Sequence, residues 1–267
     1  MLPSGPPPTA RPAPTTAALS LRGLTKRFGP TTAVDRIDLD VPRGSFYGLV
    51  GPNGAGKTTT LSMATGLLRP DLGTAHVLGV DVWADPVAAK SRIGVLPDGL
   101  RIFDRLTGLQ LVTYAGLLRG MDRGLVEQRV RELLVALGLT EAADKLVIDY
   151  SAGMTKKVTL ACALVHTPRL LVLDEPFEAV DPVSARTIRG ILEDFAASGG
   201  TVVMSSHVMD LVERICTDVA IISAGTVRAS GTLDEVRGGM GLEDRFLDLV
   251  GGSTAVEGLA WLRTSSD

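Results

Sequence analysis

The sequence predicts an α/β protein built on a mostly parallel β-sheet that is covered by helices. Three observations support this fold class. A glycine-rich turn near residue 51 joins a strand-like run to a helical pattern. The middle of the chain carries apolar residues at helical spacing, and strand-like and helical segments alternate again after residue 151. Alternation of this kind favours parallel pairing, because each helix returns the chain to the starting edge of the sheet.

Composition limits the kind of protein further. The chain has 267 residues, 45% of them hydrophobic and 21% charged, enough to close a sizeable core. The formal net charge of −3 argues against a nucleic-acid partner bound through bulk charge. Cys162 and Cys216 stand far apart without metal-ligand spacing, which predicts two buried thiols in a reducing compartment. Without a run of about 18 apolar residues, no membrane-crossing helix is expected.

The N-terminal part begins with a segment rich in Pro, Ala and Thr, Met1–Ala18, which we expect to be a disordered tail. Short β-rich runs follow at Leu19–Leu21, Ile37–Val41 and Phe46–Val50. The glycine-rich turn then leads into a helical pattern over Lys57–Leu67. A strand, a glycine loop and a helix are therefore predicted in that order.

The rest of the chain divides into a helical middle and a second α/β stretch. Apolar spacing from Thr107 to Lys145 predicts helices, which we place in a helical subdomain, about residues 100–160, inserted into the core. The later elements expected are a helix from Ser151 to Val165, a strand Leu170–Leu173, a helix Pro182–Ala197 and a strand Thr201–Ser205. The predicted organisation is a domain over 19–240 and a C-terminal tail over 241–267.

The glycine-rich turn matches the pattern of glycine, four residues, then Gly-Lys-Thr, between the strand and helix that the motif requires. Its glycines let backbone N–H groups surround phosphate oxygens at a positive helix N-terminus. Lys57 adds charge on the β and γ phosphates, the Thr58 hydroxyl can bind Mg²⁺, and Thr59 can donate to a phosphate. The alternative is a glycine-rich turn with a surface lysine. The predicted phosphate-binding set is Gly51, Pro52, Asn53, Gly54, Ala55, Gly56, Lys57, Thr58 and Thr59.

Two carboxylates follow the buried strand Leu170–Leu173, at the edge where open α/β sheets bind ligands. We assign Asp174 to the magnesium shell and Glu175 to polarising the attacking water. A solvated strand end is the alternative, and the phosphate loop favours the functional interpretation over it. His207 follows another strand at the same edge and can hydrogen-bond the γ-phosphate or serve a structural role.

His76 and His166 are interpreted as loop or helix-end residues without a functional role.

With these parts in place, the segment Tyr150-Ser-Ala-Gly-Met154 resembles the signature of the nucleotide-binding subunits of ABC transporters. The resemblance spans about 19–249 and implies a P-loop ABC cassette with an added antiparallel β subdomain. It implies that Ser151, suited to cap a helix, and Gly153 close onto the γ-phosphate of ATP held by a second cassette. Two ATP molecules would then join two cassettes face to face.

Other positions take their roles from the same resemblance. Phe28 resembles the aromatic residue that stacks on adenine, although a lone Phe is otherwise usually in the core. Asp181 resembles the aspartate that links the two active sites across the dimer. Asp98 stands where the family generally has a glutamine that touches Mg²⁺ and water, so it adds negative charge beside the triphosphate. Ala152 and Met154 also depart from the family's usual glycine and glutamine.

The function expected is an ATP-hydrolysing subunit, in which Lys57, Glu175 and His207 are catalytic and Thr58, Asp98 and Asp174 serve Mg²⁺. By resemblance it pairs with an identical or different cassette. It also docks, through a groove near Asp98 and Phe103, on an integral membrane permease at the cytoplasmic face of the membrane.

The run Leu242–Leu249 resembles the tail of cassettes that serve drug, polyketide or polysaccharide exporters, or is a plain amphipathic helix. Two alternatives for the whole chain stay open: a cassette that binds ATP without turnover, and a soluble ABC ATPase acting on ribosomes or DNA.

Overall fold

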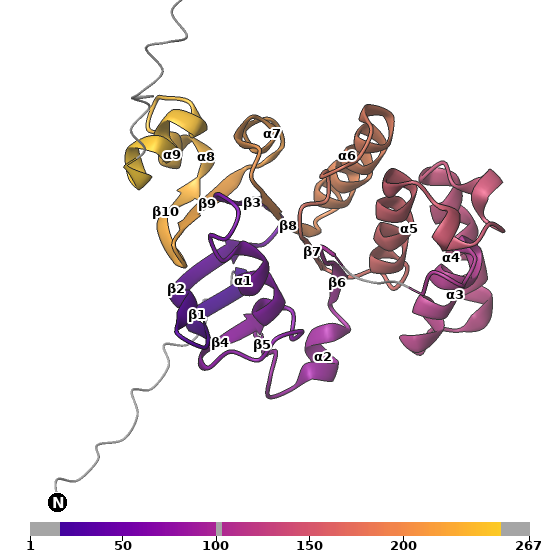
Figure 1. The fold of residues 1–267 in the computed structure, drawn as a ribbon. Coiled ribbons are helices and arrows are strands. Elements are labelled where there is room, and N and C mark those ends of the chain that lie inside the picture. The colour runs from indigo at the N-terminus through magenta and orange to yellow at the C-terminus, as the bar shows by residue number, and fades with distance from the viewer. Residues whose placement is uncertain (1–16, 100–102, 252–267) are drawn as a thin grey trace, which may run out of the picture.

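Two β-sheets and a group of helices make up the computed structural model, which describes residues 17–99 and 103–251 (Figure 1). One sheet is antiparallel, in the order β2-β1-β4-β5. The other has the order β10-β9-β3-β8-β7-β6 and is parallel except for the β9–β10 pair. The strands are β1 (Ala17–Phe28), β2 (Thr31–Pro42), β3 (Phe46–Val50), β4 (Leu72–Val77), β5 (Val80–Asp81), β6 (Ile93–Leu96), β7 (Leu170–Leu173), β8 (Thr201–Ser206), β9 (Asp218–Ser223) and β10 (Thr226–Thr232). The predicted mostly parallel sheet is confirmed.

Helices cover the parallel sheet and form the separate group. They are α1 (Lys57–Ala64), α2 (Pro86–Lys90), α3 (Gly108–Leu118), α4 (Arg123–Ala136), α5 (Ala152–Leu164), α6 (Pro182–Ala197), α7 (Met209–Ile215), α8 (Leu233–Arg237) and α9 (Leu242–Val250), with short 3₁₀ turns at Thr140–Ala142 and Val147–Asp149. Most of them begin with a side-chain cap, as where Thr107 and Gln110 form a capping box before α3. In the part of the chain that the structure describes, no helix combines the length and apolarity of a membrane span.

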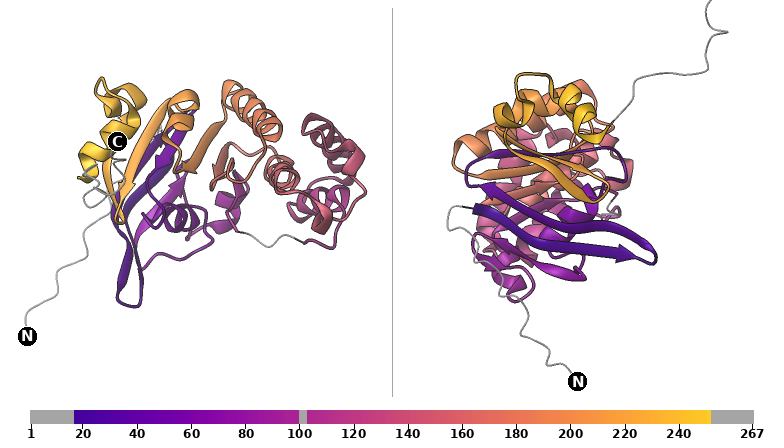
Figure 2. Two further views of the ribbon diagram at one scale, coloured as in Figure 1. Left: turned by 45° about the horizontal axis from the view of Figure 1, so that its top comes forward. Right: turned by 90° about the vertical axis from the view of Figure 1, so that its left-hand side faces the viewer.

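The parallel sheet separates the hydrophobic core into two clusters. Along β3, Phe46 and Val50 face the cluster that contains the helical group, whereas Tyr47 and Leu49 face the cluster of α1 and the antiparallel sheet. This follows from the alternation of side chains along a strand. The antiparallel sheet and the α3–α5 group consequently lie at opposite ends of the molecule (Figure 2).

Helix α5 is the member of the helical group that contacts the sheet directly. Gly94 of β6 permits this, because a Cβ there would overlap the carbonyl group of Ala163 in α5. The C-terminal end of α5 is also fixed to β6 by His166, whose Nε2 lies 3.0 Å from the Ile93 carbonyl oxygen. A carbonyl only accepts, so Nε2 carries the proton.

Two predictions at element ends are wrong. β1 begins at Ala17, inside the predicted tail, because Ala17 pairs with Pro42 and Ala18 is fully buried. The predicted helix Lys57–Leu67 ends at Ala64, where the Thr65 hydroxyl bonds back to the Leu61 carbonyl. The rest of the predicted tails, residues 1–16 and 252–267, lies outside the described residues.

Two predictions about single residues are corrected. His76 is not in a loop but in β4, opposite Ser20 of β1, where its ring is partly covered. Cys162 is only half-buried, while Cys216 is buried as expected. Burial raises the pKa of both thiols to about 12. Both cysteines are therefore neutral near neutral pH.

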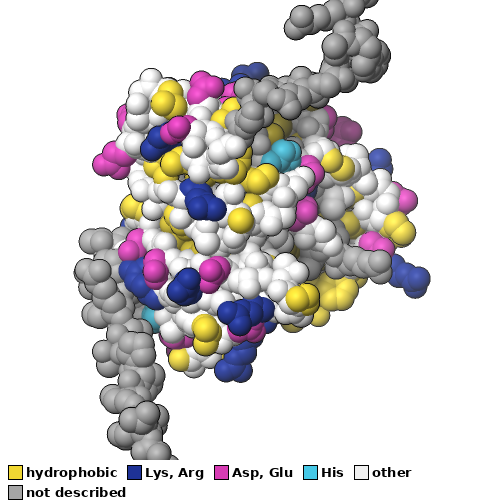
Figure 3. Space-filling model, turned by 60° about the vertical axis from the view of Figure 1, so that its left-hand side comes forward, with side chains coloured by type: hydrophobic (Ala, Val, Ile, Leu, Met, Phe, Trp, Pro, Cys, Tyr) yellow, Lys and Arg dark blue, Asp and Glu magenta, His cyan; other side chains and the backbone are white. Residues whose placement is uncertain are grey.

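The surface charge agrees with the small net charge of the sequence. Among the described residues on the face that Figure 3 shows, acidic and basic side chains are interspersed. A nucleic-acid binder is expected to present a large patch of positive charge. The described residues on this face form no such patch.

Candidate active site

The glycine loop connects β3 to α1 at the carboxyl edge of the parallel sheet. Gly56 caps α1 with a left-handed conformation, φ 102°, and without a side-chain hydrogen bond to the helix. A Cβ at Gly56 would lie 2.5 Å from the Ala33 carbonyl oxygen, so only glycine fits this close approach. The first N–H groups of α1 therefore lack a side-chain acceptor and are available to an anion.

Lys57 lies within this loop and is 6% exposed. Its ammonium group donates to the carbonyl oxygens of Gly51, at 2.8 Å, and Pro52, at 3.3 Å. It also lies 3.4 Å from Glu175 Oε1. The Lys57 ammonium group therefore lies between two carbonyl groups of the loop and the carboxylate of Glu175, which follows β7.

The three threonines after Lys57 differ in their contacts. The Thr60 hydroxyl is buried and donates to the Gly56 carbonyl at 2.8 Å, which is a structural bond. Thr58 is exposed and Thr59 is half-buried, and neither hydroxyl is hydrogen-bonded to another described residue. Thr58 and Thr59 therefore have free hydroxyls for a metal ion or a phosphate oxygen.

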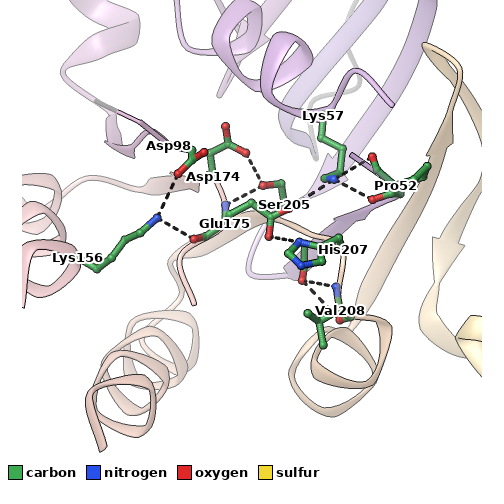
Figure 4. Close-up of polar contacts among 11 residues, drawn as sticks. Pro52, Lys57, Asp98, Lys156, Asp174, Glu175, Ser205, His207 and Val208 are labelled. Atoms are coloured by element: carbon green, nitrogen blue, oxygen red, sulfur yellow. Dashed lines mark hydrogen bonds and ion pairs between the residues drawn. The ribbon is translucent and has the colours of Figure 1, made fainter. Parts of the chain in front are cut away.

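Ser205 of β8 links the Asp174 carboxylate to the backbone of Glu175, just after β7 (Figure 4). The Ser205 hydroxyl donates to Asp174 Oδ1 at 2.5 Å, and the Glu175 N–H donates to Ser205 Oγ at 2.9 Å. Sequence reasoning missed Ser205. The signal that could have found it is a polar residue at the end of a buried strand beside the strand that bears the carboxylates.

Glu175 is held with its carboxylate between two cationic or polar groups. Oε2 lies 3.1 Å from His207 Nδ1, while Oε1 is buried and has no hydrogen-bond partner in the described residues. The backbone of Glu175 is left-handed, with φ 45°, a conformation that non-glycine residues rarely adopt. Oε1 forms an ion pair with Lys57 but accepts no hydrogen bond from the described residues, so it is suited to receive one from a water molecule.

Asp98 is paired with a lysine that sequence reasoning missed. Lys156 Nζ lies 3.5 Å from Asp98 Oδ1 and donates to the Glu175 carbonyl oxygen at 2.9 Å. Lys156 comes from α5, so this contact joins the helical group to the end of β7. A basic residue within the signature helix was the available signal.

The signature residues form a second cluster. Ser151 caps α5, as predicted, and its Oγ accepts from the Met154 N–H at 3.3 Å. A Cβ at Gly153 would lie 2.9 Å from Asp181 Oδ2, so the start of α6 packs against the signature in the same chain. Asp181 caps α6, and hydrogen bonds led by that from the Ser184 N–H lower the pKa of its carboxyl.

Phe28 lies apart from both clusters, at the end of β1. Its side chain is 51% exposed, so it is not the core residue that the alternative interpretation would require. Lys26 Nζ lies 5.7 Å from the ring centroid and 2.9 Å from Asp71 Oδ1. The ring is therefore free to stack on a planar ligand.

The donor set fits magnesium. Within residues 17–99 and 103–251, no group of three or more His, Cys, Asp or Glu side chains is arranged to hold a metal ion. Mg²⁺ commonly uses one or two carboxylates and completes its shell with phosphate oxygens and water. The buried Asp174 carboxylate and the free Thr58 hydroxyl are such a set.

Comparisons with known proteins identify relatives. The "ABC transporter" family model matches residues 34–178. The daunorubicin/doxorubicin resistance ATP-binding protein DrrA of Streptomyces peucetius is 38% identical, over 85% of this chain and 68% of that protein. The linearmycin resistance ATP-binding protein LnrL of Bacillus subtilis is 35% identical, over 80% and 69%. The Nod factor export ATP-binding protein I of Cupriavidus pinatubonensis is 36% identical, over 84% and 70%.

Solved structures agree with these relatives. An ATP-binding subunit of an ABC transporter superposes with a TM-score of 0.81 at 27% identity, over 87% of this chain and 99% of that chain. A dimeric ATP-binding cassette bound to ADP and Pi has the same fold, with a TM-score of 0.74 at 23% identity, over 80% and 98%.

Proposed function

The chain belongs to the ATP-binding subunits of ABC transporters, and on that premise we propose that it powers export through a separate membrane permease by ATP-driven closure of a cassette dimer. It is an ATPase of this family. The observation that carries the proposal is the meeting of Lys57, Glu175 and His207 at the glycine loop. The exporter direction is supported by relatives named for drug resistance and Nod factor export.

Hydrolysis follows from the charges at the loop. The N–H groups at the start of α1 and the Lys57 ammonium bind the phosphates and stabilise negative charge. Glu175 orients a water molecule and accepts its proton while the water oxygen forms a bond to the γ-phosphorus. The bond from that phosphorus to the bridging oxygen breaks, so ADP leaves with the electron pair. His207 holds Glu175 Oε2 in place.

Thr58 and Asp174 would hold Mg²⁺, with Asp98 a further candidate ligand, and the ion supplies positive charge to the β and γ phosphates when bound. The chain positions this donor set through Ser205, which fixes Asp174 Oδ1. Phe28 would stack on the adenine ring.

Dimer closure would bring the signature of one chain onto the ATP of the other. The exposed Ser151 and the start of α5 present a second helix N-terminus for the γ-phosphate. Asp181 lies beside Gly153, which places the residue proposed to link the two sites next to the signature.

The proposed permease contact lies on the helical group, which would hold the cassette at the cytoplasmic face of the membrane. Phe103 is 63% exposed and packs edge-to-face with Tyr114, their ring centroids 5.6 Å apart. Beside Tyr114 lies a cavity of about 580 Å³, which is lined on one side by Leu106, Leu109, Tyr114 and Leu117 and on the other by polar side chains that include Glu127 and Arg131 of α4. Exposed apolar surface of this kind is typical of a protein interface.

Replacing Glu175 with Gln tests the mechanism. The variant keeps the side-chain shape and loses the proton acceptor, so we expect kcat to fall about 10³-fold. Steady-state ATP hydrolysis measures this loss, and light scattering in the same samples should show that ATP drives the variant into dimers. Glu193→Gln, an exposed substitution on α6, is the matched control. Full turnover by Glu175→Gln would remove Glu175 from the mechanism, and a wild type that binds ATP without turnover would favour the switch alternative.

A further inference from the structure

We propose that Lys156 is a positioning residue for hydrolysis, which holds the Glu175 peptide from the signature helix and is itself held by Asp98. The inference rests on the proposed role of Glu175. Lys156 Nζ donates to the Glu175 carbonyl oxygen at 2.9 Å and lies 3.5 Å from Asp98 Oδ1 (Figure 4). Its side chain is 18% exposed, so the contacts are partly shielded from water.

The Glu175 backbone needs such support. A left-handed conformation costs free energy in a residue with a Cβ, and it persists only where surrounding contacts impose it. On one side the Glu175 N–H donates to Ser205 of the core. On the other its carbonyl accepts from Lys156, and from the Glu178 N–H at 3.2 Å. Lys156 is therefore the contact that reaches this peptide from the helical group.

Asp98 and Lys156 also balance each other's charge. The Asp98 carboxylate would repel a triphosphate, and the Lys156 ammonium offsets that charge at close range. In return, Asp98 restricts where the flexible lysine side chain can lie. Asp98 and Lys156 therefore form one functional unit.

Helix α5 carries both Ser151 and Lys156, so the Asp98–Lys156 pair can respond to dimer closure. Ser151 caps the same helix and is proposed to contact the ATP held by the partner, whereas Lys156 contacts the Glu175 that serves this chain's own ATP. A shift of α5 on closure would thus move the Glu175 peptide. Lys156 supplies a physical connection between the two nucleotide sites.

Three variants of the full chain test the inference, with kcat and ATP affinity measured separately for each. Lys156→Met keeps the stem and removes the charge, so we expect kcat to fall about tenfold to a hundredfold, as for a misplaced catalytic group. Equilibrium binding of a fluorescent ATP analogue should stay within about threefold of wild type, because the polar contacts of Lys156 are with Asp98 and the Glu175 carbonyl and not with the described phosphate loop. Lys156→Arg should restore kcat to within about threefold. Lys157→Met, on the same helix, is the control expected to keep kcat.

Thermal unfolding of each variant separates positioning from folding. The inference is overturned if Lys156→Met turns over ATP like wild type, or if its kcat and melting temperature fall together and Lys156→Arg restores neither. A wild type without turnover would overturn the proposed function along with it. An active wild type with an unaffected Lys156→Met variant would overturn the inference alone.

A double-mutant cycle with Asp98→Asn tests the unit itself. Because Asp98 is proposed to hold Lys156, the double variant should lose less kcat than the product of the two single losses. Losses that multiply would show that the two residues act independently, and would overturn the part assigned to Asp98.

Discussion

The helix N-termini of α1 and α5, both proposed to meet ATP, are built differently. At α1 the cap is Gly56, which offers no side-chain acceptor, so the first N–H groups stay open. At α5 the cap is Ser151, whose hydroxyl already accepts from the Met154 N–H. A phosphate can bind at α1 without displacing a protein contact, whereas at α5 the Ser151 hydroxyl must reorient to donate to it.

This difference fits two kinds of phosphate contact. The α1 end is enclosed by the glycine loop and holds the buried charge of Lys57, which suits retention of a nucleotide through the whole cycle. The α5 end is exposed at Ser151 and anchored at its far end, where His166 bonds to Ile93. A contact that gains little net free energy can break again after hydrolysis, as a clamp requires.

The largest expected effect sharpens the α1 side of the comparison. Lys57→Met removes the charge inside the loop, so ATP affinity should fall about 100-fold and hydrolysis at saturating ATP about 10³-fold. Fluorescent-nucleotide titration and steady-state turnover measure the two losses. Lys145→Met, an exposed lysine of the helical group, is the control. Near-normal affinity without Lys57 would mean that the loop N–H groups suffice.

A smaller effect tests the α5 side. Ser151→Asp keeps a good cap but puts a negative charge where the phosphate should arrive, so stability should be unchanged while ATP-driven dimerisation is lost and turnover falls about tenfold to a hundredfold. Ser151→Ala should instead lose about 1 kcal/mol of stability. Light scattering with ATP and urea unfolding distinguish the two variants. A Ser151→Asp chain that dimerises normally would refute the contact.

The smallest effect concerns the anchored end of α5. Burial, and then the charge of Arg119, lower the pKa of His166 to about 4, below the ordinary value of 6.5. Between these two pH values His166 is protonated in the unfolded chain but neutral in the folded chain. Its contribution to the free energy of unfolding is therefore complete above about pH 6.5 and is lost as the pH falls toward 4. His166→Gln removes this titration and can still donate to Ile93.

The measurement compares melting temperatures of wild type and His166→Gln at pH 7 and pH 5. Allowing for the partial exposure of the ring, the wild type should lose about 2–4 °C more than the variant. Equal losses would mean that His166 is protonated in the fold as easily as in the unfolded chain.

The parts of the site that could be predicted from sequence are those encoded within a few consecutive residues. The glycine loop, the Asp174-Glu175 pair and the Ser151 cap each depend on a local strand or helix end, which periodicity places well. Ser205 and Lys156 were missed because their partners are 31 and 19 residues away, and only the sheet order and the packing of α5 bring them together.

Errors in the fold prediction have a similar cause. His76 lies in a strand because β4 pairs with β1. The glycine-containing sequence around His76 does not predict this pairing. Ala17 and Ala18 are ordered by pairing and burial against β2 and the core rather than by their own strand propensity, which is low for alanine. The helix after Lys57 ends early because Thr65 and Gly66 terminate it locally.

The position of β3 also has a consequence for biosynthesis. Among the described strands, this one is fully buried along Phe46–Val50 and pairs with β8 and β9, which begin at Thr201 and Asp218. A nascent chain therefore carries the loop-bearing strand without its neighbours until most of the protein has left the ribosome. Such long-range pairing is slow and exposes apolar surface meanwhile. Chains released before β9 would be substrates for chaperones and proteases, and the cell would gain nucleotide-binding capacity only from chains that extend through β9.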